Sequence, residues 1–132
     1  MVNKSFDQIE SRISDAVFVK ISENVSTKLL FKDILYIKSD AMYSRIYFEA
    51  KGSSKNNYYT ISQSSNNLIM KIGCPALVKV HKSYYVNIQR IERIQDGQIY
   101  IQGAITPIPI GREFKNEFSE KIKLIKHNSV QK

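Results

Sequence analysis

The stretch Leu77–Asn87, L-V-K-V-H-K-S-Y-Y-V-N, constrains the fold more than any other part of this chain. Apolar, β-branched and aromatic side chains lie on both sides of a short polar break, a composition that suits two half-buried strands joined by a turn. Asn87 ends the stretch with an amide that can brace a neighbouring backbone turn. The sequence therefore predicts a junction rich in hydrogen-bond donors, which is either a solvated bend or an edge that faces an anion. The donors are Lys79, His81, Lys82 and Ser83.

Short β patterns fill most of the remaining chain. Alternating or all-apolar runs predict strands at residues 17–21, 27–31, 34–37, 43–48, 58–61, 89–94 and 98–101. The run at 34–37 is nearly all apolar, so we expect it to be buried on both faces. The pattern breaks over residues 39–42, and a hairpin turn is predicted over 51–57. The run at 105–110 resembles a strand, but Pro107 and Pro109 restrict it to a sheet edge.

An amphipathic pattern precedes the first strand. In the segment Ser5–Ala16, Phe6, Ile9 and Ile13 recur at helical spacing. Because the rest of the segment is polar and lies near a terminus, it predicts a linker or docking helix and not a part of the core.

Two further helices are predicted. The first spans residues 64–72, where Gly73 followed by Pro75 is a stop signal. The second spans Arg112–Lys126 and has one apolar stripe. The whole pattern therefore predicts a mainly β fold of many short strands with two or three peripheral helices. The stripe consists of Phe114, Phe118, Ile122 and Ile125.

Length and charge limit the classes of protein to which this chain can belong. A chain of 132 residues fits one domain, and 20 Lys and Arg against 12 Asp and Glu give a net charge of +8. Such a surface attracts nucleic acid first and acidic membrane second, although a basic solvated surface gives the same count. No apolar run approaches the ~18 residues that a membrane span needs. Since Cys74 is the only cysteine and no signal-peptide core is present, we expect a cytoplasmic location.

The sequence gives little evidence of catalytic activity. His81 and His127 are the two histidines and lie far apart, and no common metal, nucleophile, P-loop or dinucleotide motif occurs. Cys74 lies beside Pro75 at a predicted helix end, a setting more typical of a buried thiol than of a nucleophile. We therefore predict no catalytic residue, no metal ligand and no cofactor.

Basic or polar residues also occur at two other turns. Tyr43 and Arg45 follow the break after the buried strand, where such a pair either contacts nucleic acid or forms a solvated sheet face. Gly111 allows a sharp turn, and Arg112 begins the predicted last helix, whose free N–H groups attract phosphate. The alternative there is a surface arginine without a role. For His81, a hydrogen-bonded structural ring is favoured over a phosphate contact.

The segment Val78–Asn87 resembles the signature of LytTR DNA-binding domains, typically written F-x-R-V-H-R-S-Y-I-V-N. Two matching segments precede it, D-I-L-Y-I-K-S at Asp33–Ser39 and A-M-Y at Ala41–Tyr43. Two follow it, I-E-R-I at Ile91–Ile94 and I-P-I-G-R-E-F at Ile108–Phe114. The resemblance extends over residues 16–126, with 1–15 as an N-terminal linker or helix and 127–132 as a polar tail.

The resemblance implies an elongated fold of about ten short, mostly antiparallel strands in small packed sheets with two or three peripheral helices. Such domains are output modules of bacterial transcription regulators and insert loops into successive major grooves of promoter repeats. The implied partner is double-stranded DNA, and a homodimer on DNA and a receiver domain or sensor partner outside this chain are also compatible with it. The implied DNA-binding residues are Tyr43, Ser44, Arg45, Lys79, His81, Lys82, Ser83, Gly111 and Arg112.

Some positions depart from the family pattern, and two other functions remain open. Lys79 and Lys82 stand where arginine is common, and lysine lacks the planar two-donor fork, so phosphate contact is better supported than base reading. A single-stranded nucleic-acid or RNA-binding β module fits the many tyrosines and the basic pI. It requires exposed stacking rings, whereas Tyr84 and Tyr85 lie among apolar residues. A protein-interaction module with an acidic partner is the third class.

Overall fold

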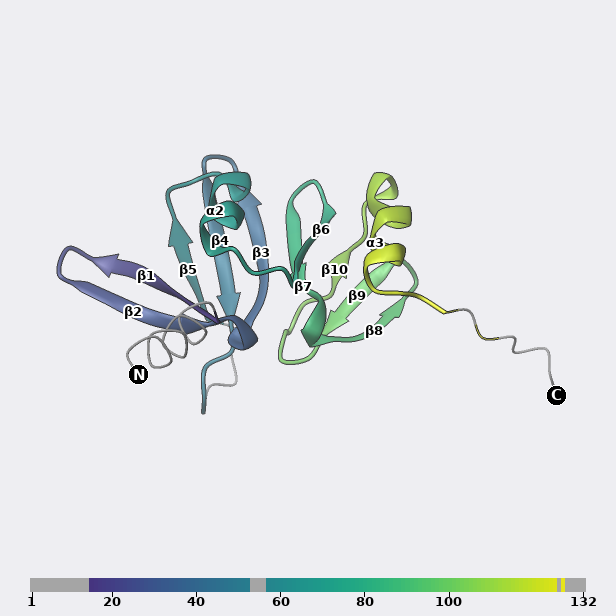
Figure 1. Ribbon diagram of the computed structural model, residues 1–132, viewed down its shortest axis with the longest axis horizontal. Coiled ribbons are helices and arrows are strands. Elements are labelled where there is room, and N and C mark those ends of the chain that lie inside the picture. The colour runs from purple at the N-terminus through teal and green to yellow at the C-terminus, as the bar shows by residue number, and fades with distance from the viewer. Residues whose placement is uncertain (1–14, 53–56, 126, 128–132) are drawn as a thin grey trace, which may run out of the picture.

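The computed structural model describes residues 15–52, 57–125 and 127 (Figure 1). The described residues form ten strands in three antiparallel sheets and two α-helices. The strands are β1 (Ala16–Ser22), β2 (Val25–Leu30), β3 (Ile34–Asp40), β4 (Tyr43–Phe48), β5 (Asn57–Ile61), β6 (Leu77–His81), β7 (Tyr84–Asn87), β8 (Ile91–Gln95), β9 (Gln98–Ile101) and β10 (Ile108–Pro109). The helices are α2 (Ser65–Ile72) and α3 (Lys115–Lys121), with 3₁₀ turns at Phe31–Asp33, Ile88–Arg90 and Arg112–Phe114. The predicted mainly β fold is confirmed.

The three sheets follow one another along the long axis of the molecule. The hairpin β1–β2 lies at one end, the sheet β10-β9-β8 at the other, and the five-stranded sheet β5-β4-β3-β7-β6 between them (Figure 1). This central sheet is therefore the scaffold that positions both ends.

Strand β3 lies in the middle of the central sheet and contributes to two cores. Ile37 packs into the core under α2, whereas Leu35 and Tyr36 pack into the core shared with β9, β10 and α3. The prediction that residues 34–37 are buried on both faces is confirmed. The first core also contains Ile46, Leu68, Ile72 and Leu77, and the second Val80, Val86, Ile99, Ile108 and Phe118.

Local sequence signals fix both the helix α2 and the junction after it. The hydroxyl of Ser64 accepts a hydrogen bond from the backbone N–H of Asn67 at 3.3 Å, and Gly73 ends the helix at φ 67°. The amide of Asn87 donates to the carbonyls of Phe31 at 3.1 Å and Ile34 at 2.8 Å. The predicted helix and the predicted bracing role of Asn87 are both confirmed.

Several predicted boundaries are wrong. β3 continues to Asp40, so residues 39 and 40 are strand and only Ala41 and Met42 form the turn. Residues 89 and 90 belong to a 3₁₀ turn, and the strand predicted at 105–110 is reduced to β10 at the edge of its sheet. The segment 5–14 lies outside the described residues, as do residues 53–56 of the predicted hairpin turn, and Ala16 begins β1.

The last predicted helix is shorter than expected. Residues 112–114 form a 3₁₀ turn, and α3 ends at Lys121. Lys123 then adopts φ 57°, a left-handed conformation that stops the helix. As a result Phe118 is buried as predicted, whereas Ile125 is 88% exposed and does not continue the stripe.

Candidate nucleic-acid interface

Three turns that are far apart in the sequence meet at one edge of the molecule. They are the β3–β4 turn, the β6–β7 turn and the segment Gly111–Arg112 after β10, all along the upper edge in Figure 1. Backbone hydrogen bonds join them: Ser39 N donates to the Ser83 carbonyl at 2.8 Å, and Gly111 N donates to the Val80 carbonyl at 2.7 Å. We call this set of turns the turn edge.

The β3–β4 turn presents an aromatic ring and a restrained arginine. Tyr43 is 50% exposed. The Arg45 guanidinium lies 3.7 Å from the Asp40 carboxylate and 4.9 Å from the centre of the Tyr58 ring. A hydrogen bond to the Tyr47 side chain, together with Tyr58 and Asp40, raises the pKa of Arg45 above its usual value. Arg45 is thus a permanent cation held against the sheet face.

The side chain of Ser44 is not exposed at the turn edge. Its side chain is completely buried, and its hydroxyl donates to the Gln63 carbonyl at 2.8 Å and lies 3.1 Å from the Ser65 hydroxyl. The Ser65 hydroxyl also contacts that of Ser39. The Ser44 side chain therefore fastens the β3–β4 turn to the start of α2 and does not face outward, which argues against the predicted contact of this side chain with DNA.

His81 shapes the β6–β7 turn. Its Nδ1 accepts a hydrogen bond from the Ser83 backbone N–H at 3.1 Å, so the neutral ring carries its proton on Nε2. The ring meets Tyr84 edge-on, with centroids 5.5 Å apart, and is only half-buried. Between them, Lys82 is exposed and Ser83 is half-buried. This geometry fits the structural role favoured from the sequence.

Lys79 lies below the turn and not at its tip. The ammonium group is 5.7 Å from the Tyr85 ring centre and 5.8 Å from that of Phe114. Its side chain therefore spans the gap between β6 and the 3₁₀ turn after Gly111, and it is half-buried there.

Gly111 is required for close packing, not for a left-handed turn. Its φ of −70° is open to any residue. A Cβ atom at this position, however, would lie 3.0 Å from the Phe114 ring and 3.4 Å from the Cα of His81. Arg112 is exposed, but it begins a single 3₁₀ turn and α3 starts three residues later. The helix N-terminus predicted to attract phosphate at Arg112 is therefore absent from that position.

Two further residues at the turn edge, Lys38 and Met42, were not among the contacts predicted from the sequence. Lys38 lies on β3 next to Arg45, with its ammonium group 6.0 Å from the Tyr84 ring centre. Met42 is exposed at the tip of the β3–β4 turn. The alternation of β3 would have placed Lys38 on the same face as Tyr36, but the turn expected at 39–42 hid this relation.

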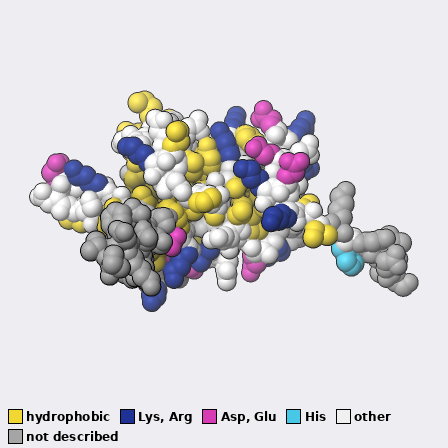
Figure 2. All heavy atoms as spheres, in the orientation of Figure 1, with side chains coloured by type: hydrophobic (Ala, Val, Ile, Leu, Met, Phe, Trp, Pro, Cys, Tyr) yellow, Lys and Arg dark blue, Asp and Glu magenta, His cyan; other side chains and the backbone are white. Residues whose placement is uncertain are grey.

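Charge is mixed on the visible surface. Figure 2 shows Lys and Arg side chains interspersed with Asp and Glu, and not one uninterrupted basic patch. Among the residues that the structure describes, no group of three His, Cys, Asp or Glu could hold a metal ion. No helix in the described part of the chain is long and apolar enough to cross a membrane.

The chain was compared with known proteins and families. The family model of the LytTr DNA-binding domain matches residues 24–123. The chain belongs to the LytTR family. The match begins in the β1–β2 hairpin and includes all three segments of the turn edge.

Several chains of solved structures match this chain, and one of them is compared in detail. It is the LytTr DNA-binding domain of a protein described as a methyl-accepting/DNA response regulator from Bacillus cereus, with a TM-score of 0.60 and 12% sequence identity. The alignment covers 83% of this LytTR chain and 98% of the other. At this identity the likeness concerns the fold alone. No curated protein matches the chain.

Proposed function

We propose that this LytTR domain binds double-stranded DNA sequence-specifically as the output domain of a bacterial transcription regulator. The observation that carries the proposal is the convergence of three turns on one edge of the molecule, where Lys82 in one turn and Arg112 in another are exposed. In this proposal the turns enter successive major grooves of promoter repeats, and two copies on neighbouring repeats form a dimer on DNA.

The residues of the turn edge divide into two roles. Tyr43, Arg45, Lys82, Ser83 and Arg112 contact DNA. Lysine acts as a point charge on phosphate, whereas the arginine fork also fits a guanine edge. The turns are positioned from within the protein by Lys79, His81 and Gly111.

Binding to matched duplex, single-stranded DNA and RNA tests this proposal. If about five phosphates are neutralised, log affinity against log salt should have a slope near −4 to −5 for duplex DNA. Selection from random duplexes should return a repeated motif. A slope near zero, or equal affinity for single strands, would contradict the proposal.

A second candidate function is single-strand binding, and one observation favours it. Tyr36, Tyr47 and Tyr58 form a row across β3, β4 and β5, with ring centres 4.3 Å and 5.1 Å apart, and Tyr58 is 46% exposed. Burial raises the pKa of Tyr36, so its ring remains neutral. If bases stack on this row, Tyr58→Ala should lower the affinity for single strands far more than the affinity for duplex DNA, which it can affect only through the Arg45 guanidinium beside the ring.

A further inference from the structure

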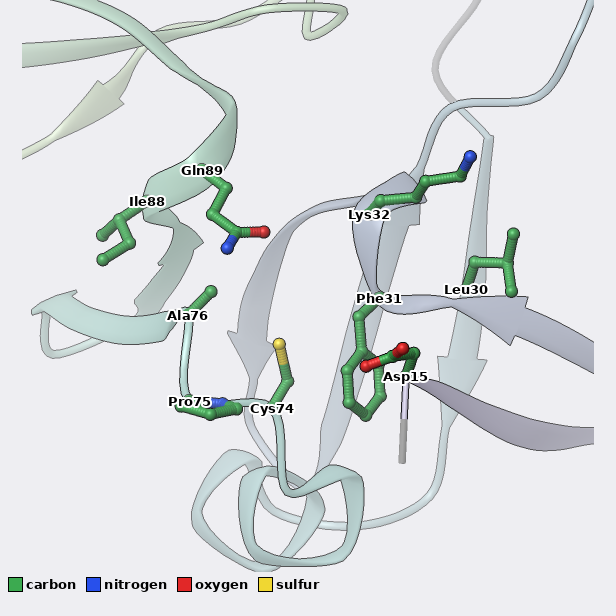
Figure 3. A pocket seen from close by; sticks show the side chains of 9 residues that line it. All are labelled: Asp15, Leu30, Phe31, Lys32, Cys74, Pro75, Ala76, Ile88 and Gln89. Atoms are coloured by element: carbon green, nitrogen blue, oxygen red, sulfur yellow. The ribbon is translucent and has the colours of Figure 1, made fainter. Parts of the chain in front are cut away.

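An apolar groove of about 680 Å³ lies at the opposite end of the central sheet from the turn edge. The segment between α2 and β6 forms one wall, and the end of β2 with the following 3₁₀ turn forms the other (Figure 3). The Cys74 sulfur points into the space between these walls (Figure 3). The lining residues are Asp15, Leu30, Phe31, Lys32, Cys74, Pro75, Ala76, Ile88 and Gln89.

The chain enters the described part of the structure at the rim of this groove. Asp15 lines it, and the Asp15 carbonyl accepts a hydrogen bond from the backbone N–H of Phe31 at 2.9 Å. Ile13 is two residues away, so its Cα lies within about 7 Å of that of Asp15. Covalent attachment at Asp15 therefore gives the N-terminal segment a high effective concentration at the groove.

The N-terminal sequence matches the groove in character. Phe6, Ile9 and Ile13 fall on one face if the segment is helical, and Ser11 falls on the opposite face. An apolar face needs an apolar surface to bury it. The groove beside Asp15 offers such a surface in Leu30, Phe31 and Ile88, together with Cys74 and Ala76.

We propose that the groove is the docking site of residues 5–13 of the same chain, which bind as an amphipathic helix with Phe6, Ile9 and Ile13 facing Cys74. Cys74 is already buried at the edge of the core under α2, and the docked helix covers the side of the thiol that faces the groove. It also fixes the direction in which the chain leaves the DNA-binding domain, at the end remote from the turn edge.

Thiol reactivity of the full-length chain tests this inference. Cys74 is the only cysteine, so N-ethylmaleimide reports on one site. Ile9→Asp places a charge on the docking face and should raise the labelling rate about tenfold by opening the groove locally. The matched control, Ser11→Asp, adds the same charge on the opposite face and should label as slowly as the parent.

Unfolding and dimerisation are separated in the same assay. Local opening gives a labelling rate that is independent of low urea concentrations, whereas a rate that rises steeply with urea reflects global unfolding and overturns the proposal. Protection that increases with protein concentration means that a second copy fills the groove, which also overturns it. An Ile9→Asp chain that labels as slowly as the parent also overturns the proposal. Duplex affinity should be unchanged in both variants, so failure here leaves the proposed function untouched.

Discussion

The two ends of the central sheet are held together in different ways. At the groove end, one buried side chain, Asn87, links β7 to the start of β3, and an ion pair between Arg90 and Glu49 joins the sheets nearby. At the turn edge, backbone hydrogen bonds join the turns, the buried Ser44 hydroxyl fastens one of them to the Gln63 carbonyl, and Lys82 and Arg112 are exposed. The groove end thus depends on a buried amide, whereas the turn edge combines a bonded backbone with side chains that are available for contact.

Asn87→Leu should have the largest effect on stability. It leaves the carbonyls of Phe31 and Ile34 without their donor and should lower the free energy of unfolding by ~2–4 kcal/mol. Urea denaturation measures this. Gln89→Ala, an exposed neighbour, is the control and should change little. If both variants were equally stable, the groove end would not depend on the buried amide.

Arg112→Ala should lower the affinity for DNA and leave the stability of the fold unchanged. We expect a loss of ~1–3 kcal/mol in duplex binding, because a charged fork is removed, with the thermal midpoint unchanged. Fluorescence anisotropy measures the binding. Lys121→Ala removes the same charge at the far end of α3 and should retain nearly full affinity. Arg112→Lys restores binding if the contact is a phosphate and fails on the selected site if it is a base.

Ser44→Ala tests whether a buried side chain also stabilises the turn edge. Loss of the hydroxyl leaves the Gln63 carbonyl without this donor and should cost ~1–2 kcal/mol of stability. The salt dependence of DNA binding should stay the same, since no phosphate contact is removed. Ser62→Ala, exposed on the neighbouring loop, is the control. A changed salt slope in Ser44→Ala would return Ser44 to the contact set.

Lys82→Ala and His81→Ala should give the smallest effects and differ in kind. Lys82→Ala should weaken binding to all duplexes and reduce the magnitude of the salt slope by about one, without loss of stability. His81→Ala removes one half-buried hydrogen bond and should cost ~1 kcal/mol of stability. If His81→Ala instead kept its stability and lost binding, the ring would be a contact and not a brace.

The sequence predicted those parts of the structure that depend on nearby residues. The buried strand at 34–37, helix α2 with its Gly73 end, and the β6–β7 junction all follow from local periodicity and caps. The errors arise where distant contacts decide. The backbone N–H of Gly111 donates to the distant Val80 carbonyl, a contact that the local pattern does not show. Helix α3 ends before left-handed Lys123, where no glycine marks the end of the helix.

Of the candidate site, the positions of the three turns were predicted, but not the direction of every side chain. The contact residues were carried over as whole loops, so Ser44 was included although strand alternation already placed it opposite Tyr43 and Arg45. Lys38 was left out because β3 was expected to end before it could share a face with Arg45.

The backbone bonds between the turns have a consequence for how DNA specificity can diverge. Neither the bond from Ser39 to Ser83 nor that from Gly111 to Val80 uses a side chain, so replacing the exposed residues leaves the spacing of the turns intact. Under the proposed mode of DNA binding, new base preferences can then arise when a few side chains at the turn tips are exchanged and the backbone stays the same. Gly111 is the exception, because a Cβ atom there would lie 3.0 Å from the Phe114 ring, and that ring would have to shift to make room for it.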